Sequence, residues 1–75
     1  MESPVYTLSF GDWIKQRRKA LDLTQERLAQ AVGCSVVLIR KIESEERRPS
    51  RQIAGLIAKA LEVPPEERQT FIKIN

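Results

Sequence analysis

The central segment of the chain, residues 23–43, reads LTQERLAQAVGCSVVLIRKIE. Apolar residues recur at helical spacing on both sides of Gly33, and glycine suits the left-handed residue that ends a helix. The apolar stripes are formed by Leu28, Ala29 and Val32 before the glycine and by Ile39 and Ile42 after it. The segment therefore predicts two short helices, at about 25–32 and 36–44, joined by a turn as in a helix-turn-helix.

Hydroxyl residues mark the predicted helix starts along the rest of the chain. Ser9, Thr24, Ser35 and Ser50 each precede a run of helical spacing, where a hydroxyl can accept an otherwise unpaired backbone N–H. They place one helix at about 10–20, before the motif, and another at about 51–61, after it. The Pro64-Pro65 pair favours a fifth helix, because proline fits the first helical turn. No strand is predicted, so the expected fold class is all-α, a compact bundle of five short helices.

The helix at 51–61 has the most regular apolar pattern in the chain. Its apolar residues at i, i+3, i+4, i+7 and i+8 are Ile53, Leu56, Ile57, Ala60 and Leu61. We expect this stripe to face the core.

The length and composition limit the class of protein. A chain of 75 residues has room for one core, so we assign 1–8 to an N-terminal extension and 9–75 to a single helix-turn-helix domain with its motif at 24–44. There is no histidine and one cysteine, which argues against a metal site and an intramolecular disulfide. No nucleophile–base constellation, phosphate-binding glycine loop or membrane-spanning apolar run is present. We expect a cytoplasmic binding domain without metal, cofactor or catalytic activity.

The positive charge is concentrated in the middle of the chain. The formal net charge is +3, but residues 13–51 alone carry ten basic and five acidic side chains. A clustered basic surface suits a polyanion such as DNA. The alternative is that these charges serve only to keep a small domain in solution.

The motif resembles the XRE family, the phage repressor and Cro-like helix-turn-helix proteins. The matching residues are Leu23-Thr24-Gln25-Glu26-x-Leu28-Ala29-x-x-Val32-Gly33-x-Ser35-x-x-x-Ile39-x-x-Ile42-Glu43, with Ile14-x-x-x-Arg18 before them and Arg47-x-Pro49-Ser50 after them. The resemblance covers roughly Phe10 to Val63. It implies a lambda-repressor-like domain that binds double-stranded DNA sequence-specifically in transcriptional regulation, with the recognition helix at about 36–44 in the major groove.

Helical geometry selects the side chains that could read bases. With Ile39 facing the core, the outward face of its helix carries Val37, Arg40, Lys41 and Ser44, and Ser35 and Val36 stand at the end that enters the groove. The base-reading candidates are Ser35, Val36, Val37, Arg40 and Lys41, and the resemblance implies that role for all of them except Arg40. The two cations could donate to guanine or to phosphate, whereas the valines could contact only thymine methyl groups. Alternatively, Val36 is partly buried in the core and Val37 is an incidental surface residue.

Phosphate contacts are expected from the residues beside the recognition helix. The resemblance implies that Gln25, at the start of its helix, bonds a backbone phosphate. Three further candidates lie in or just after the loop that follows the recognition helix: Arg47, Arg48 and Arg51. Alternatively, these arginines neutralise the neighbouring glutamates at positions 45 and 46.

Other residues are assigned to the architecture of the domain. The resemblance implies a salt bridge between Arg18 and Glu43 that positions the recognition helix. Relatives often carry glycine where Glu45 stands, so we expect either a longer helix or a different turn there. Packing roles are expected for Cys34 and Trp13. A solvated face is expected for Lys15, Arg17 and Lys19.

Two further interpretations stay open at this level. The chain could be a protein-interaction domain that keeps the fold without specific DNA binding. The segment 10–14, read together with 47–52 and 64–68, looks like the N-terminal module of larger bacterial regulators.

The fifth helix, with Phe71 and Ile72, is the candidate homodimer interface, unless both residues pack within their own chain.

Overall fold

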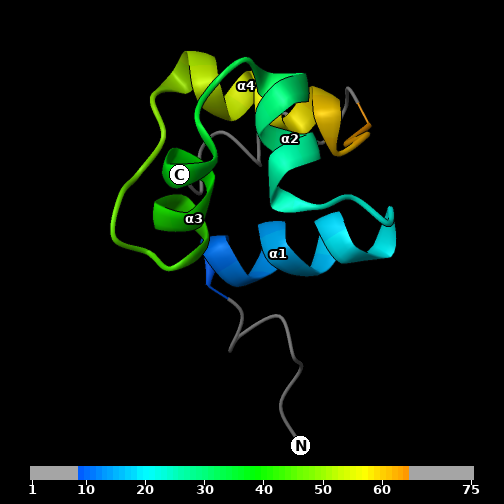
Figure 1. The fold of residues 1–75 in the computed structure, drawn as a ribbon, viewed down its shortest axis with the longest axis horizontal. Helices are drawn as coiled ribbons and strands as arrows, with labels where there is room; N and C mark the ends of the chain where they lie inside the picture. The colour runs from blue at the N-terminus through cyan, green and yellow to red at the C-terminus, as the bar shows by residue number, and fades with distance from the viewer. Residues whose placement is uncertain (1–8, 65–75) are drawn as a thin grey trace, which may run out of the picture.

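The computed structural model describes residues 9–64, which form four helices and no strand. The helices are α1 (Phe10–Ala20), α2 (Gln25–Val32), α3 (Val36–Glu43) and α4 (Arg51–Ala60). In Figure 1, α1 runs along one side of the domain and α4 along the opposite side, with α2 between them and α3 beside them. The all-α prediction is confirmed. The predicted fifth helix, with Phe71 and Ile72, lies outside the described residues.

Each helix begins as its hydroxyl residue predicts. The side-chain oxygen of the cap accepts the backbone N–H three residues later, at 3.0 to 3.2 Å. The pairs are Ser9 with Asp12, Thr24 with Arg27, Ser35 with Leu38, and Ser50 with Ile53. Each such cap typically stabilises a helix by about 1 kcal/mol.

Each of the four helices is followed, within two residues, by a residue with left-handed backbone geometry. The residues and their φ angles are Asp22 at 59°, Gly33 at 86°, Glu45 at 68° and Glu62 at 59°. In each case the N–H of the next residue bonds the carbonyl five positions before it, as Glu46 N does with Lys41 O at 2.8 Å. This is the Schellman arrangement, which pairs the last carbonyls of a helix.

The expectation at Glu45 was therefore wrong in both its forms. α3 ends one residue earlier than predicted, at Glu43, and Glu45 itself adopts the left-handed geometry that glycine favours. Its strain is offset by two Schellman hydrogen bonds and by a hydrogen bond that its carboxylate accepts from the Gly11 N–H of α1.

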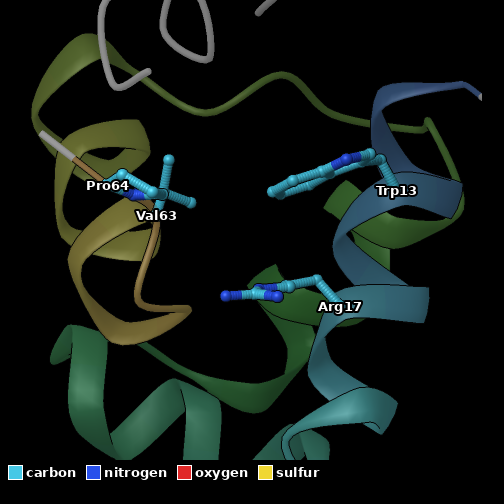
Figure 2. A pocket seen from close by; sticks show the side chains of 4 residues that line it. All are labelled: Trp13, Arg17, Val63 and Pro64. Atoms are coloured by element: carbon cyan, nitrogen blue, oxygen red, sulfur yellow. The ribbon is translucent and has the colours of Figure 1, made fainter. Parts of the chain in front are cut away.

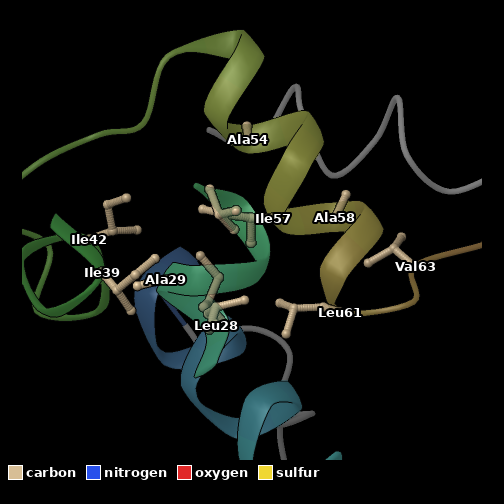
Figure 3. Packing of buried hydrophobic residues seen from close by; sticks show 11 residues of the cluster. Leu28, Ala29, Ile39, Ile42, Ala54, Ile57, Ala58, Leu61 and Val63 are labelled. Carbon is tan, nitrogen blue, oxygen red and sulfur yellow. The ribbon is translucent and has the colours of Figure 1, made fainter. Parts of the chain in front are cut away.

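The core is a single apolar cluster to which all four helices contribute (Figure 3). Its fully buried large side chains are Ile14, Leu28, Ile39, Ile42, Ile57 and Leu61. The predicted face of α4 needs correction, because Ala54, Ile57, Ala58 and Leu61 are buried while Leu56 is 37% exposed. The helix α4 packs against α2, and Ile53 and Ala60 lie at the margin of the core, where they are only partly buried.

Candidate nucleic-acid interface

The turn between α2 and α3 is fixed by backbone hydrogen bonds. The N–H groups of Gly33 and Cys34 both donate to the Ala29 carbonyl, at 2.8 and 3.0 Å. Ser35 then caps α3, so only three residues separate the two helices. Cys34 is partly buried and packs against the core, and burial raises the pKa of its thiol. A thiol in this setting suits the packing role expected for it.

The helix α3 presents one face to the core and the opposite face to solvent. Ile39, Ile42 and Glu43 are buried. Ser35, Arg40 and Lys41 are exposed, and Val37 is 50% exposed, which is unusual for an apolar side chain in this domain. Val36 is partly buried against the core. Of the two predicted valines, therefore, only Val37 stands fully on the outward face.

A buried ion pair holds the inner face of α3 to α1. Arg18 Nε donates to Glu43 Oε2 at 2.7 Å, and a terminal nitrogen of Arg18 donates to Glu43 Oε1 at 3.2 Å. The other terminal nitrogen donates to the Leu23 carbonyl at 2.9 Å. Both residues are only 7% exposed. The pair that the family resemblance implies is thus present, and it links α1, the α1–α2 turn and α3.

Gln25 and Arg40 continue this network to the surface. Gln25 Nε2 donates to Glu43 Oε1 at 3.0 Å, and Arg40 Nε donates to Gln25 Oε1 at 3.3 Å. The sequence gives no periodic signal for this connection. The structure brings together two predicted DNA-contacting residues, one from α2 and one from α3.

The first turn of α1 lies directly against the last turn of α3. A Cβ atom on Gly11 would stand 2.7 Å from the Ile42 carbonyl oxygen and would also collide with the Glu43 carbonyl. Only glycine permits this approach without a shift of the backbone. Together with the Glu45 carboxylate on the Gly11 N–H, the contact fixes the end of α3 opposite to its cap. Sequence reasoning missed this role of Gly11.

The loop after α3 and the first residue of α4 carry the predicted phosphate-contacting arginines. Arg47, Arg48 and Arg51 are all exposed, and the loop is anchored by the buried Pro49. The adjacent carboxylates have other partners: that of Glu46 accepts the Ser44 hydroxyl at 2.8 Å, and that of Glu45 accepts the Gly11 N–H.

The solvated face that the sequence predicts for Arg17 is wrong, because this side chain bonds backbone carbonyls of the segment after α4. Its Nε donates to the Leu61 carbonyl at 2.9 Å, and a terminal nitrogen donates to the Glu62 carbonyl at 3.3 Å. A cation is favourable there, because the last carbonyls of a helix carry partial negative charge. The only sequence signal is its position one turn after Trp13, on the edge of the apolar stripe of α1.

A pocket lies between α1 and the segment after α4. Figure 2 shows Trp13 and Arg17 facing Val63 and Pro64 across it. None of the predicted DNA-contacting residues lines this pocket. Trp13 also packs against the core, as expected.

Two further searches cover only the described part of the chain. Within residues 9–64, no group of three or more His, Cys, Asp or Glu side chains could hold a metal ion. None of the four helices there is long and apolar enough to cross a membrane.

Comparisons with known proteins agree with this geometry. The helix-turn-helix family HTH_3 matches residues 14–68. A protein of Rhodospirillum rubrum, described as an uncharacterized transcriptional regulator in the ATPase CF(0) region, is 46% identical over 54 residues. That alignment covers 72% of this chain and 50% of the relative, so the chain spans about half the length of that relative. No solved structure matches the chain.

Proposed function

The chain belongs to the XRE-type helix-turn-helix family, and on this basis we propose that it binds double-stranded DNA sequence-specifically, with α3 in the major groove. The observation that carries the proposal is the way α3 is held. Its inner face is fixed by Ile39, Ile42 and the buried Glu43, which leaves a continuous outward strip that ends at the Ser35 cap. A single α-helix fits the width of the major groove of B-DNA.

The base-reading role is assigned to the outward strip of α3. Lys41 would donate to the O6 and N7 atoms of guanine, and Val37 would pack against a thymine methyl group. Ser35 would reach the bases or sugars at the end of α3 that enters the groove. Val36, being partly buried, would offer only the edge of its side chain.

The phosphate-binding role is assigned to both sides of this strip. Gln25 stands at the first position of α2, and Arg47, Arg48 and Arg51 lie in and after the loop that follows α3. Such contacts would orient the domain on the duplex and supply the salt-dependent part of the affinity.

The biological role proposed is transcriptional regulation, as the description of the Rhodospirillum rubrum relative suggests. Because the chain spans about half of that relative, we also propose that the domain can serve as the DNA-binding module of a longer regulator. A homodimer through the C-terminal segment would then read two half-sites about one turn of DNA apart, roughly 34 Å.

Selection from a random duplex library tests the proposal. The purified chain would be incubated with the library at low and at near-physiological salt, and the retained DNA sequenced. Enrichment of a defined site is expected, and an inverted repeat would in addition indicate a dimer. Retention without enrichment would contradict sequence-specific binding. No retention at either salt would favour the protein-interaction alternative.

A matched pair of variants sharpens the test. Lys41→Ala is expected to relax the base preference at one position of the enriched site and to lower affinity for that site by about 1–3 kcal/mol. Lys59→Ala removes the same charge from an exposed position in the last turn of α4, and it should change neither the base preference nor the affinity for the site. An equal loss on every sequence for Lys41→Ala would remove this residue from the base-reading set.

A further inference from the structure

Four side chains form a continuous hydrogen-bonded chain from the core to the outward face of α3. It runs from Arg18 to Glu43, from Glu43 to Gln25 and from Gln25 to Arg40. The first two residues are buried, Gln25 is partly buried, and Arg40 is exposed. The exposed Arg40 is therefore connected, through Gln25, to the buried ion pair.

The donor and acceptor groups of these four side chains determine which way the Gln25 amide points. Glu43 is a carboxylate that can only accept hydrogen bonds, and both of its oxygens already accept from Arg18. The amide group of Gln25 must therefore turn its NH₂ toward Glu43, which directs its oxygen the other way. Arg40 can only donate, so it is the complementary partner for that oxygen.

The consequence is a defined direction for the Arg40 guanidinium. Its Nε bond to Gln25 draws the side chain from α3 toward the first turn of α2. The four N–H donors on its terminal nitrogens remain for a ligand. In helix-turn-helix complexes the bases lie beneath the recognition helix, whereas the helix before it crosses the DNA backbone.

We propose that Arg40 contacts a backbone phosphate of DNA and not a base, and that Gln25 is the residue that positions it. This rests on the proposed function, and it removes Arg40 from the base-reading candidates, among which helical spacing alone places it. Base recognition by cations then falls to Lys41, the neighbour of Arg40 on α3.

Salt titrations of DNA affinity test this assignment. The wild type and the variants Arg40→Ala, Arg40→Lys, Gln25→Ala and Lys59→Ala would be titrated with the library-selected duplex and with a scrambled duplex of the same length. Two quantities are measured: the slope of log affinity against log salt concentration, and the affinity ratio between the two duplexes. Thermal melts of each variant verify folding.

The expected result separates the two kinds of contact. Arg40→Ala should reduce the salt slope by about 0.9 and lower affinity about fivefold at 0.15 M salt on both duplexes, leaving their ratio unchanged. Arg40→Lys should keep the slope but lose part of the affinity, because one ammonium group has to serve both Gln25 and the phosphate. Lys59→Ala should match the wild type.

The positioning role of Gln25 has its own readout. If Gln25 holds Arg40 in place, Arg40→Ala should cost less affinity in the Gln25→Ala background than in the wild type. Equal costs in the two backgrounds would overturn the positioning role.

Other outcomes would overturn the phosphate assignment. A changed affinity ratio with an unchanged salt slope would make Arg40 a base reader, and no change in either quantity would remove it from the interface. In both cases a wild type that still prefers the selected duplex leaves the proposed function intact. If the wild type binds neither duplex at low salt, the proposed function and this inference both fail.

Discussion

Replacing Arg18 by methionine is expected to lower the free energy of unfolding by about 3–5 kcal/mol. The Arg18 guanidinium is buried and makes three hydrogen bonds, two to the Glu43 carboxylate and one to the Leu23 carbonyl. Methionine fills much of the same volume, so the main cost is electrostatic. Glu43, 7% exposed, would keep Gln25 as a donor but lose its opposite charge.

The size of this loss is large for so small a domain. A folded chain of this length has a stability of about 4–11 kcal/mol, at 0.05–0.15 kcal/mol per residue. The variant therefore loses about a quarter of that stability at the least, and in the least favourable case all of it. Each kcal/mol lowers the melting temperature by about 4–8 °C in a domain of this size, so a drop of more than about 12 °C is expected.

Urea unfolding measures this effect. The unfolding is monitored by far-UV circular dichroism and by the fluorescence of Trp13, which is the only tryptophan. Lys19→Met, an exposed cation one residue further along α1, is the matched control and should lose less than about 0.5 kcal/mol. The double variant Arg18→Met/Glu43→Leu removes both charges and should regain most of the loss. A loss below about 1 kcal/mol for Arg18→Met alone would refute the conclusion that the ion pair fixes α3 to α1.

Three further predictions concern particular backbone positions and the single thiol. Gly11→Ala should destabilise the domain by about 1–3 kcal/mol in urea unfolding, because the added Cβ would collide with the carbonyls at the end of α3. Gly55→Ala, at a position with open space around it, should instead stabilise α4 by about 1 kcal/mol. Equal effects of the two substitutions would contradict the close approach of α1 to α3. Glu62→Gly should raise stability by about 0.5–1 kcal/mol, because it relieves a left-handed residue while the carbonyl bonded by Arg17 is kept, and a lower urea midpoint would argue against that geometry. Burial raises the pKa of Cys34, so the folded chain has less thiolate at pH 8 than the unfolded chain and should react more slowly with iodoacetamide; faster reaction in the folded state would reverse the sign of that pKa shift.

Local signals predicted most of the secondary structure. The starts of all four described helices follow from their hydroxyl caps, and Gly33 correctly marks the end of α2. These features depend on residues within one helical turn of each other, so they can be predicted from sequence alone.

The errors occur where distant segments decide the outcome. On α4, two apolar stripes compete, and the structure buries the one with Ala54 and Ala58 while Leu56 stays exposed, which depends on how the helices pack and not on the pattern within α4. The left-handed geometry of Glu45 is supported by Gly11, which is 34 positions away in the chain. Arg17 bonds carbonyls more than 40 positions away. No local pattern contains that information.

In the candidate interface, too, some features could be predicted from the sequence and others only from the folded structure. The resemblance to the family indicated the Arg18–Glu43 pair, and helical spacing indicated the exposed faces of Val37 and Lys41. The link from Glu43 through Gln25 to Arg40 depends on side-chain directions in two helices, so only the folded arrangement reveals it.

The most direct test of the central claim is to map the DNA-binding surface by NMR with the isotope-labelled chain and the library-selected duplex. The account predicts that the largest amide shifts occur at Gln25, in Ser35–Val37 and at Lys41, while Lys59 and Val63 remain unchanged. Shifts centred on Trp13, Arg17 and Val63, with α3 unaffected, would contradict the claim that the exposed face of α3 binds DNA.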